Sequence, residues 1–189
     1  CKYNILNNYR EFNNEVTNFD CYQGWSNIII NKCEFHNLSD TDAGGSLWIR
    51  DFKNFGSKNI KVLSSYFHKI AHDEIIAVFQ GKVEDVLIKN NTFKVEETGL
   101  STSVMNFSFG SNSSILAKNI SFINNKVDTL ATGGLIWANG ENIIIKDNEI
   151  NTYISKSCTG NFRLFESTNN EKIISLIENN NINLKSNLI

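Results

Sequence analysis

The chain has 189 residues, and 41% of them are apolar, which is enough for one domain with a hydrophobic core. A net charge of -2 provides no basic field of the kind that nucleic acid or an anionic membrane requires, so neither is expected as a partner. No apolar run approaches the ~20 residues of a membrane span, and the four cysteines form no CxxC pair, so we expect no membrane insertion, no metal and no cofactor.

Residues 1–26 precede the first clear repeat and are expected to form an N-terminal capping or linking segment. Residues 27–189 are expected to form one repeat domain. Its repeated phrase is Asn-Ile-x-Ile, followed by a short polar break and another apolar residue. Copies begin at residues 27, 59, 85, 119 and 142 and, in a looser form, at 174. Such spacing is typical of one supersecondary unit per repeat.

Each copy predicts a β-strand, because its apolar residues alternate with a period of two and are largely β-branched. A second, weaker strand series lies between the copies, at residues 44–49, 73–78, 105–110, 133–137 and 161–165. Two strands per repeat, wound in one sense, would pair with the same strands of neighbouring repeats. We therefore predict an all-β protein, a right-handed parallel β-helix of about six coils.

A row of small polar residues emerges when the copies are stacked. The position five residues after the first apolar residue holds Cys33, Ser65, Asn91, Asn125, Asn148 and Asn180. Asparagine both donates and accepts hydrogen bonds at its amide, and it tolerates left-handed backbone conformations. The row resembles the asparagine ladder of β-helices; the alternative is that abundant asparagine fills these positions by chance.

The candidate catalytic residues begin with His72, Asp73 and Glu74, which lead directly into an apolar strand. Adjacent carboxylates beside an imidazole can acquire different pKa values and act as acid and base in glycosidic bond cleavage. Asp42, in the loop before the preceding strand, is a candidate third carboxylate. The alternative is that Asp73 and Glu74 only cap a turn before a buried strand.

Residues 73–78, Asp-Glu-Ile-Ile-Ala-Val, resemble the Asp-Asp-Cys-Ile-Ala-Ile stretch of the polygalacturonase family. Residues 107–111 resemble that family's Ile-Ser-Ile-Gly-Ser. The resemblance places residues 27–184 with the pectin-lyase-like superfamily of β-helices, which also includes phage tailspikes. It implies that Asp73 matches the first of the paired acids and that Glu74 matches the second, the general acid.

The chain departs from the polygalacturonase pattern at three places. The family's histidine falls on Met105, its Arg-Ile-Lys clamp has no counterpart near residues 135–137, and its Asn-Thr-Asp motif is replaced at residues 45–47. Polygalacturonase activity itself is therefore not expected.

Trp48 and Trp137 occupy analogous places in their predicted strands, and Arg50 follows Trp48 closely. If the indoles face outward they can stack on sugar rings, with Arg50 and His72 as further substrate-binding groups; if they face inward they belong to the core. We therefore expect a glycan-binding and, with Asp73, Glu74 and Asp42, a glycan-cleaving β-helix of a bacterial or bacteriophage surface or tail appendage. The alternative is a non-catalytic structural or receptor-binding module, as a homotrimer or in a larger assembly.

Overall fold

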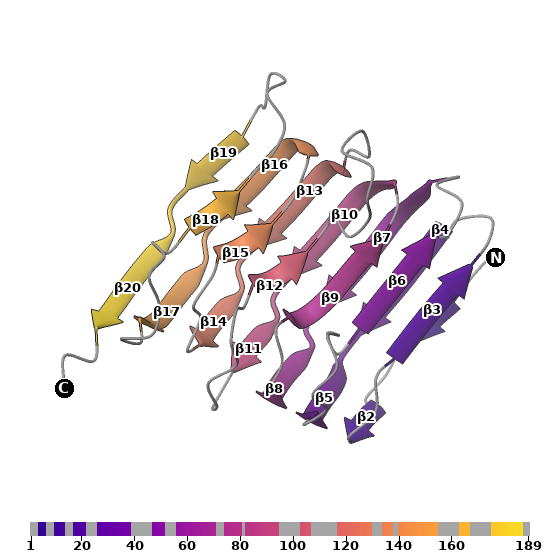
Figure 1. Ribbon diagram of the computed structural model, residues 1–189, viewed down its shortest axis with the longest axis horizontal. Coiled ribbons are helices and arrows are strands. Elements are labelled where there is room, and N and C mark those ends of the chain that lie inside the picture. The colour runs from indigo at the N-terminus through magenta and orange to yellow at the C-terminus, as the bar shows by residue number, and fades with distance from the viewer. Residues whose placement is uncertain are drawn as a thin grey trace.

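The protein is described from a computed structural model (Figure 1). It describes the backbone of residues 4–6, 10–13, 17–21, 26–38, 47–51, 56–70, 74–80, 82–94, 103–106, 117–129, 134–137, 140–154, 163–166 and 175–186. Side chains are described for residues 26–36, 56–68, 82–94, 117–128, 141–151 and 176–183.

Three sheets of parallel strands make up the described part of the chain, and successive strands belong to the three sheets in turn. The first sheet contains β1 (Asn4–Leu6), β4 (Ser26–Asn31), β7 (Ser57–Leu63), β10 (Val83–Lys89), β13 (Ala117–Ile123), β16 (Gly140–Lys146) and β19 (Ser175–Glu178). The second contains β2 (Arg10–Asn13), β5 (Cys33–Leu38), β8 (Tyr66–Ile70), β11 (Thr92–Lys94), β14 (Lys126–Thr129), β17 (Glu149–Ile154) and β20 (Asn181–Ser186). The third contains β3 (Thr17–Cys21), β6 (Leu47–Asp51), β9 (Glu74–Gln80), β12 (Ser103–Asn106), β15 (Gly134–Trp137) and β18 (Arg163–Glu166).

The all-β prediction with parallel strands is confirmed. Figure 1 shows the strands stepping along the long axis from β3 near the N-terminus to β19 and β20 near the C-terminus. Within residues 1–26, β1, β2 and β3 pair with β4, β5 and β6, so this segment supplies the first strand of each sheet. No helix among the described residues is long and apolar enough to cross a membrane.

The repeated phrase forms the first sheet, in the register that the stacked copies predict. Ile28 pairs with Ile60, Ile60 with Val86, and Val86 with Ile120, and all four side chains are buried. The residues two positions later, including Ile30 and Val62, are buried as well. The period of two therefore corresponds to one face of each strand that is packed into the interior.

The prediction of two strands per repeat is wrong, because each copy is divided between two sheets. Its polar break contains a residue with positive φ, and the chain turns there from the first sheet into the second. These residues are Lys32, Ser64, Asn90, Asn124, Asp147 and Asn179. A second set with positive φ is formed by the first residues of the copies, Asn27, Asn59, Asp85, Asn119 and Asn142. Asparagine and aspartate adopt this conformation more readily than other side chains do.

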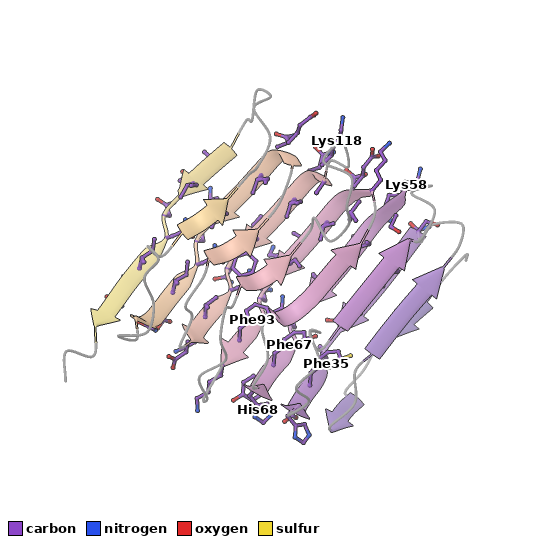
Figure 2. All side chains as sticks on the ribbon, in the orientation of Figure 1. Phe35, Lys58, Phe67, His68, Phe93 and Lys118 are labelled. Carbon is purple, nitrogen blue, oxygen red and sulfur yellow. The ribbon has the colours of Figure 1, made fainter. Side chains whose placement is uncertain are left out.

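The core beneath the second sheet contains a column of phenylalanines. The ring centroids of Phe35 and Phe67 lie 4.6 Å apart with nearly parallel planes, and Phe93 continues the column 5.1 Å beyond Phe67. Figure 2 shows these three side chains on neighbouring strands. All three are fully buried, and each contributes about 1.5–3 kcal/mol of hydrophobic stabilisation relative to an exposed side chain.

The asparagine ladder is confirmed. The backbone N–H of Asn91 donates to Oδ1 of Asn125 at 2.9 Å, and that of Asn125 donates to Oδ1 of Asn148 at 2.8 Å. Each amide Nδ2 also donates to a backbone carbonyl, as from Asn125 to Ile88 at 3.0 Å. The described ladder residues do not adopt positive φ. The residue before each of them does, and the ladder side chain is thereby directed into the core.

Candidate functional site

The third sheet carries the predicted site residues that fall among the described residues. Trp48 and Arg50 lie in β6, Glu74 begins β9, and Trp137 ends β15. Asp42, His72 and Asp73 lie outside the described residues. The structure thus brings predicted site residues of three separate segments onto a single sheet.

Trp48 and Trp137 share one register row across this sheet. Trp48 pairs with Val78, Val78 with Asn106, and Asn106 with Trp137. The two tryptophan positions are therefore three strands apart, or about 14 Å at the usual spacing of neighbouring strands. The row runs across the strands, along the long axis of the molecule.

Arg50 lies two residues after Trp48 in β6, so the two positions share one face of the sheet. Arg50 pairs with Gln80 at the far end of β9, whereas Glu74 is the first residue of that strand. Six residues of strand correspond to about 20 Å. The sheet therefore brings Arg50 close to the tryptophan row and separates it from Glu74.

Alternate rows of the third sheet differ in composition. The row of the two tryptophans continues to Asn18 at one end and Glu166 at the other, and is polar apart from Val78 and the indoles. The neighbouring row consists of Thr17, Leu47, Ala77, Met105, Ile136 and Phe165. Such alternation is typical of a sheet with one buried and one solvated face.

A second group of polar side chains, which the sequence reasoning missed, lies on the second sheet. His68 Nε2 lies 2.8 Å from Glu34 Oε1. The ring of His68 is stacked on Tyr66, with centroids 4.2 Å apart, and on His36, with centroids 5.1 Å apart. Glu34, His36, Tyr66 and His68 are named here the imidazole cluster, and Figure 2 shows His68 at the outer side of β8.

The imidazole cluster combines a hydrogen-bonded His–Glu pair with flat rings, so Glu34 holds the imidazole of His68 in a fixed orientation. It was missed because its members are 32 to 34 residues apart in pairs such as His36 with His68 and Glu34 with His68. The signal was present, since His36 and His68 both lie eight residues after the first apolar residue of their copies. No group of three or more His, Cys, Asp or Glu side chains among the described residues is arranged to hold a metal ion.

The outer side of the first sheet carries ion pairs between neighbouring strands. Lys118 Nζ lies 3.4 Å from Glu141 Oε2, and Lys146 Nζ lies 3.0 Å from Glu178 Oε2. The hydrogen bond and the charge of Glu178 raise the pKa of Lys146, and the charge of Asp147 adds to this effect. Exposed pairs of this kind contribute little stability individually. Figure 2 shows Lys118 near the start of β13.

Comparisons with protein-family models, with curated proteins and with solved structures found no match to this chain.

Proposed function

We propose that the protein is a right-handed parallel β-helix. The parallel pairing within each sheet and the fixed order in which the chain visits the three sheets support this. Connections between parallel strands are right-handed in about 98% of cases, because only that hand packs a twisted strand back onto its sheet. An experimental structure with left-handed connections would overturn the proposal.

We propose further that this β-helix binds a glycan along its third sheet. The protein would act at a bacterial surface or in a bacteriophage tail appendage, outside the cell or on the virion. The row shared by Trp48 and Trp137 carries the proposal. An indole offers a flat apolar face and an N–H donor, which together suit a sugar ring. A linear polysaccharide lying along the long axis reaches both positions, and Arg50 supplies charge-assisted hydrogen bonds beside Trp48.

The test of glycan binding uses a panel of bacterial surface polysaccharides and measures affinity by retardation in polysaccharide-containing gels. Trp48→Ala and Trp137→Ala are each expected to weaken binding about fivefold to tenfold. Leu87→Ala on the first sheet and Tyr66→Ala on the second are matched controls and should bind as the unaltered chain does. Loss of binding in Tyr66→Ala alone would transfer the site to the imidazole cluster and contradict the proposal.

Glycan cleavage is the finer part of the proposal. Asp73 and Glu74 act as acid and base, Asp42 assists as a third carboxylate, and His72 contacts the substrate. Asp73→Asn and Glu74→Gln are expected to abolish depolymerisation, since hydrolysis needs a proton donor and a second carboxylate. Binding by these variants should be retained. If the unaltered protein does not shorten the polysaccharide, the hydrolase part of the proposal is wrong and the protein is a glycan-binding module only.

A non-catalytic structural or receptor-binding module is the second candidate function. The regular ladder and the phenylalanine column favour it, because they provide a rigid rod without requiring any reactive group. Such modules act in homotrimers or larger surface assemblies, so mass measured by light scattering is the relevant observation. A module of this kind would show receptor or assembly binding that Trp48→Ala and Trp137→Ala leave unchanged.

A further inference from the structure

The first sheet carries a row of alternating charge near the start of four neighbouring strands. Lys58 in β7 pairs with Glu84 in β10, Glu84 with Lys118 in β13, and Lys118 with Glu141 in β16. Lys58 is exposed, and the side chains of the other three are 34 to 38% exposed. Figure 2 shows Lys58 and Lys118 at the same margin of the sheet. These four residues are named here the alternating row.

Ion pairs within the chain use only part of the bonding capacity of the alternating row. Glu84 Oε1 lies 3.3 Å from Lys82 Nζ, and Glu141 Oε2 lies 3.4 Å from Lys118 Nζ. Each pair engages one oxygen of its carboxylate, and both carboxylate and ammonium groups can hold several partners at once. No ion pair of Lys58 is present among the described residues. The row can therefore bind further charges from outside.

Reversal of the alternating row exchanges every charge for its opposite. A two-fold axis that runs parallel to the strands and passes between β10 and β13 places Lys58 opposite Glu141 of a second copy, and Glu84 opposite its Lys118. An axis through β10 or β13, or two copies with parallel long axes, places like charges opposite each other. Opposite charges across an interface favour association, and like charges suppress it. The row therefore fits a second copy of the chain in an antiparallel arrangement.

Aliphatic side chains lie on the outward side of the same strands. Leu63, Ile123 and Ile144 are half-buried, next to inward residues that are fully buried. The same two-fold axis places them opposite lysines of the second copy, at positions 146, 89 and 61 respectively. The methylene stem of a lysine can cover an aliphatic side chain while its ammonium group stays in water. No like charges meet at these positions.

We propose that the outward face of the first sheet, over β7, β10, β13 and β16, is an interface between two copies of this chain related by that two-fold axis. Such an interface is isologous, so each pair of residues occurs twice and the assembly closes at two copies. The alternating row forms a polar rim beside the aliphatic side chains, as in other protein–protein interfaces. The tryptophan row lies on the third sheet, so this inference does not depend on glycan binding.

The test measures the mass of the full chain by sedimentation velocity at micromolar to millimolar concentrations. Lys58→Glu and Glu141→Lys, each alone, bring like charges together at two places and are expected to weaken the dimer at least about tenfold. An equimolar mixture of the two variants should regain the dimer, because Glu at position 58 then faces Lys at position 141 and the native Glu141 faces the native Lys58. Lys126→Glu, which reverses an exposed charge of an ion pair on the second sheet, is the matched control and should dimerise as the unaltered chain does.

Four results would overturn the proposal. These are a monomer at every concentration, a trimer in place of a dimer, a dimer that Lys58→Glu leaves unchanged, and a mixture of the two variants that stays monomeric. Preferential pairing of Lys58→Glu with the unaltered chain would show that the long axes are parallel, which contradicts the antiparallel arrangement. Circular dichroism of each variant verifies folding. Recovery on mixing provides a second measurement, because loss of folding in one variant is not repaired by addition of the other.

Discussion

Removal of one ladder side chain is predicted to be among the most destabilising single changes in this protein. Asn125 is 2% exposed, and its amide bonds to Asn91 and Ile88 of the preceding coil and to Asn148 of the following coil. Its Oδ1 accepts from the backbone N–H and from Nδ2 of Asn91, and its Nδ2 donates to the carbonyl of Ile88. Asn125→Ala removes these three bonds, although Asn91 Nδ2 keeps its bond to the carbonyl of Val62.

The magnitude follows from the cost of buried unsatisfied polar groups, which is about 1–3 kcal/mol each. Counting the N–H of Asn91 and the carbonyl of Ile88, two such groups give an expected loss of about 2–6 kcal/mol in the free energy of unfolding, a large part of the ~5–15 kcal/mol that a domain of this kind possesses. Asn125→Ser should lose less, since Ser65 occupies the same row and its hydroxyl accepts from the N–H of Cys33 at 3.2 Å. Urea unfolding followed by circular dichroism measures all three proteins.

The matched control is Asn119→Gly, at an exposed position of β13 in the first sheet. Asn119 Nδ2 donates to Asp85 Oδ1 at 2.8 Å, but water replaces this bond when the side chain is removed. Glycine retains the positive φ of this position at little steric cost. The expected loss is below about 1 kcal/mol. A loss below about 1 kcal/mol for Asn125→Ala, or equal losses at the two positions, would refute the reasoning from burial.

Three further predictions concern the core, the turns and the charged face. Phe67→Ala should reduce the free energy of unfolding by about 3–5 kcal/mol, because it opens a cavity between Phe35 and Phe93; thermal unfolding measures it, and a loss below about 1 kcal/mol would contradict the packing. Lys32→Asn should raise the free energy of unfolding by about 0.5–1 kcal/mol in urea titrations, because asparagine accommodates the positive φ that lysine adopts here at a cost; an unchanged value would contradict this. Glu178→Gln should lower the pKa of Lys146, because Glu178 raises that pKa; NMR titration of the lysine side chain measures it. The contribution of the pair to stability is fully present below the ordinary lysine pKa and disappears as pH rises through the raised pKa.

The sequence predicted the rows that local chemistry determines. Ile28, Ile60 and their equivalents were identified because alternation of apolar residues is a local signal, and Asn91 to Asn180 because five-residue spacing is preserved in every copy. The third strand of each repeat was missed because the break between strands is short. The turn between the first and second strands of a repeat depends on one residue with positive φ. Lysine or serine, as at Lys32 and Ser64, does not indicate that conformation in the sequence, whereas a glycine would.

The imidazole cluster and the first strands of the sheets depend on contacts between coils. Glu34 and His68 become neighbours only when their strands are placed in register, which requires loops of unequal length to be aligned. In residues 1–26, Asn4 pairs with Ile28, so an asparagine stands where the next five copies have an apolar residue. The pattern that identifies the repeat is thus broken in its first member, and only pairing reveals it.

The division between inward and outward rows explains why the scaffold is easier to derive than the function. Inward positions must fit the same neighbours above and below, so residue type repeats there, as in Phe35, Phe67 and Phe93. Outward positions have no such requirement, and successive coils can differ without cost to the core. Trp48 and Trp137 recur in one row although Val78 and Asn106 lie between them. Under the proposed glycan binding, a ligand that spans several coils explains why tryptophan recurs at two positions of this row.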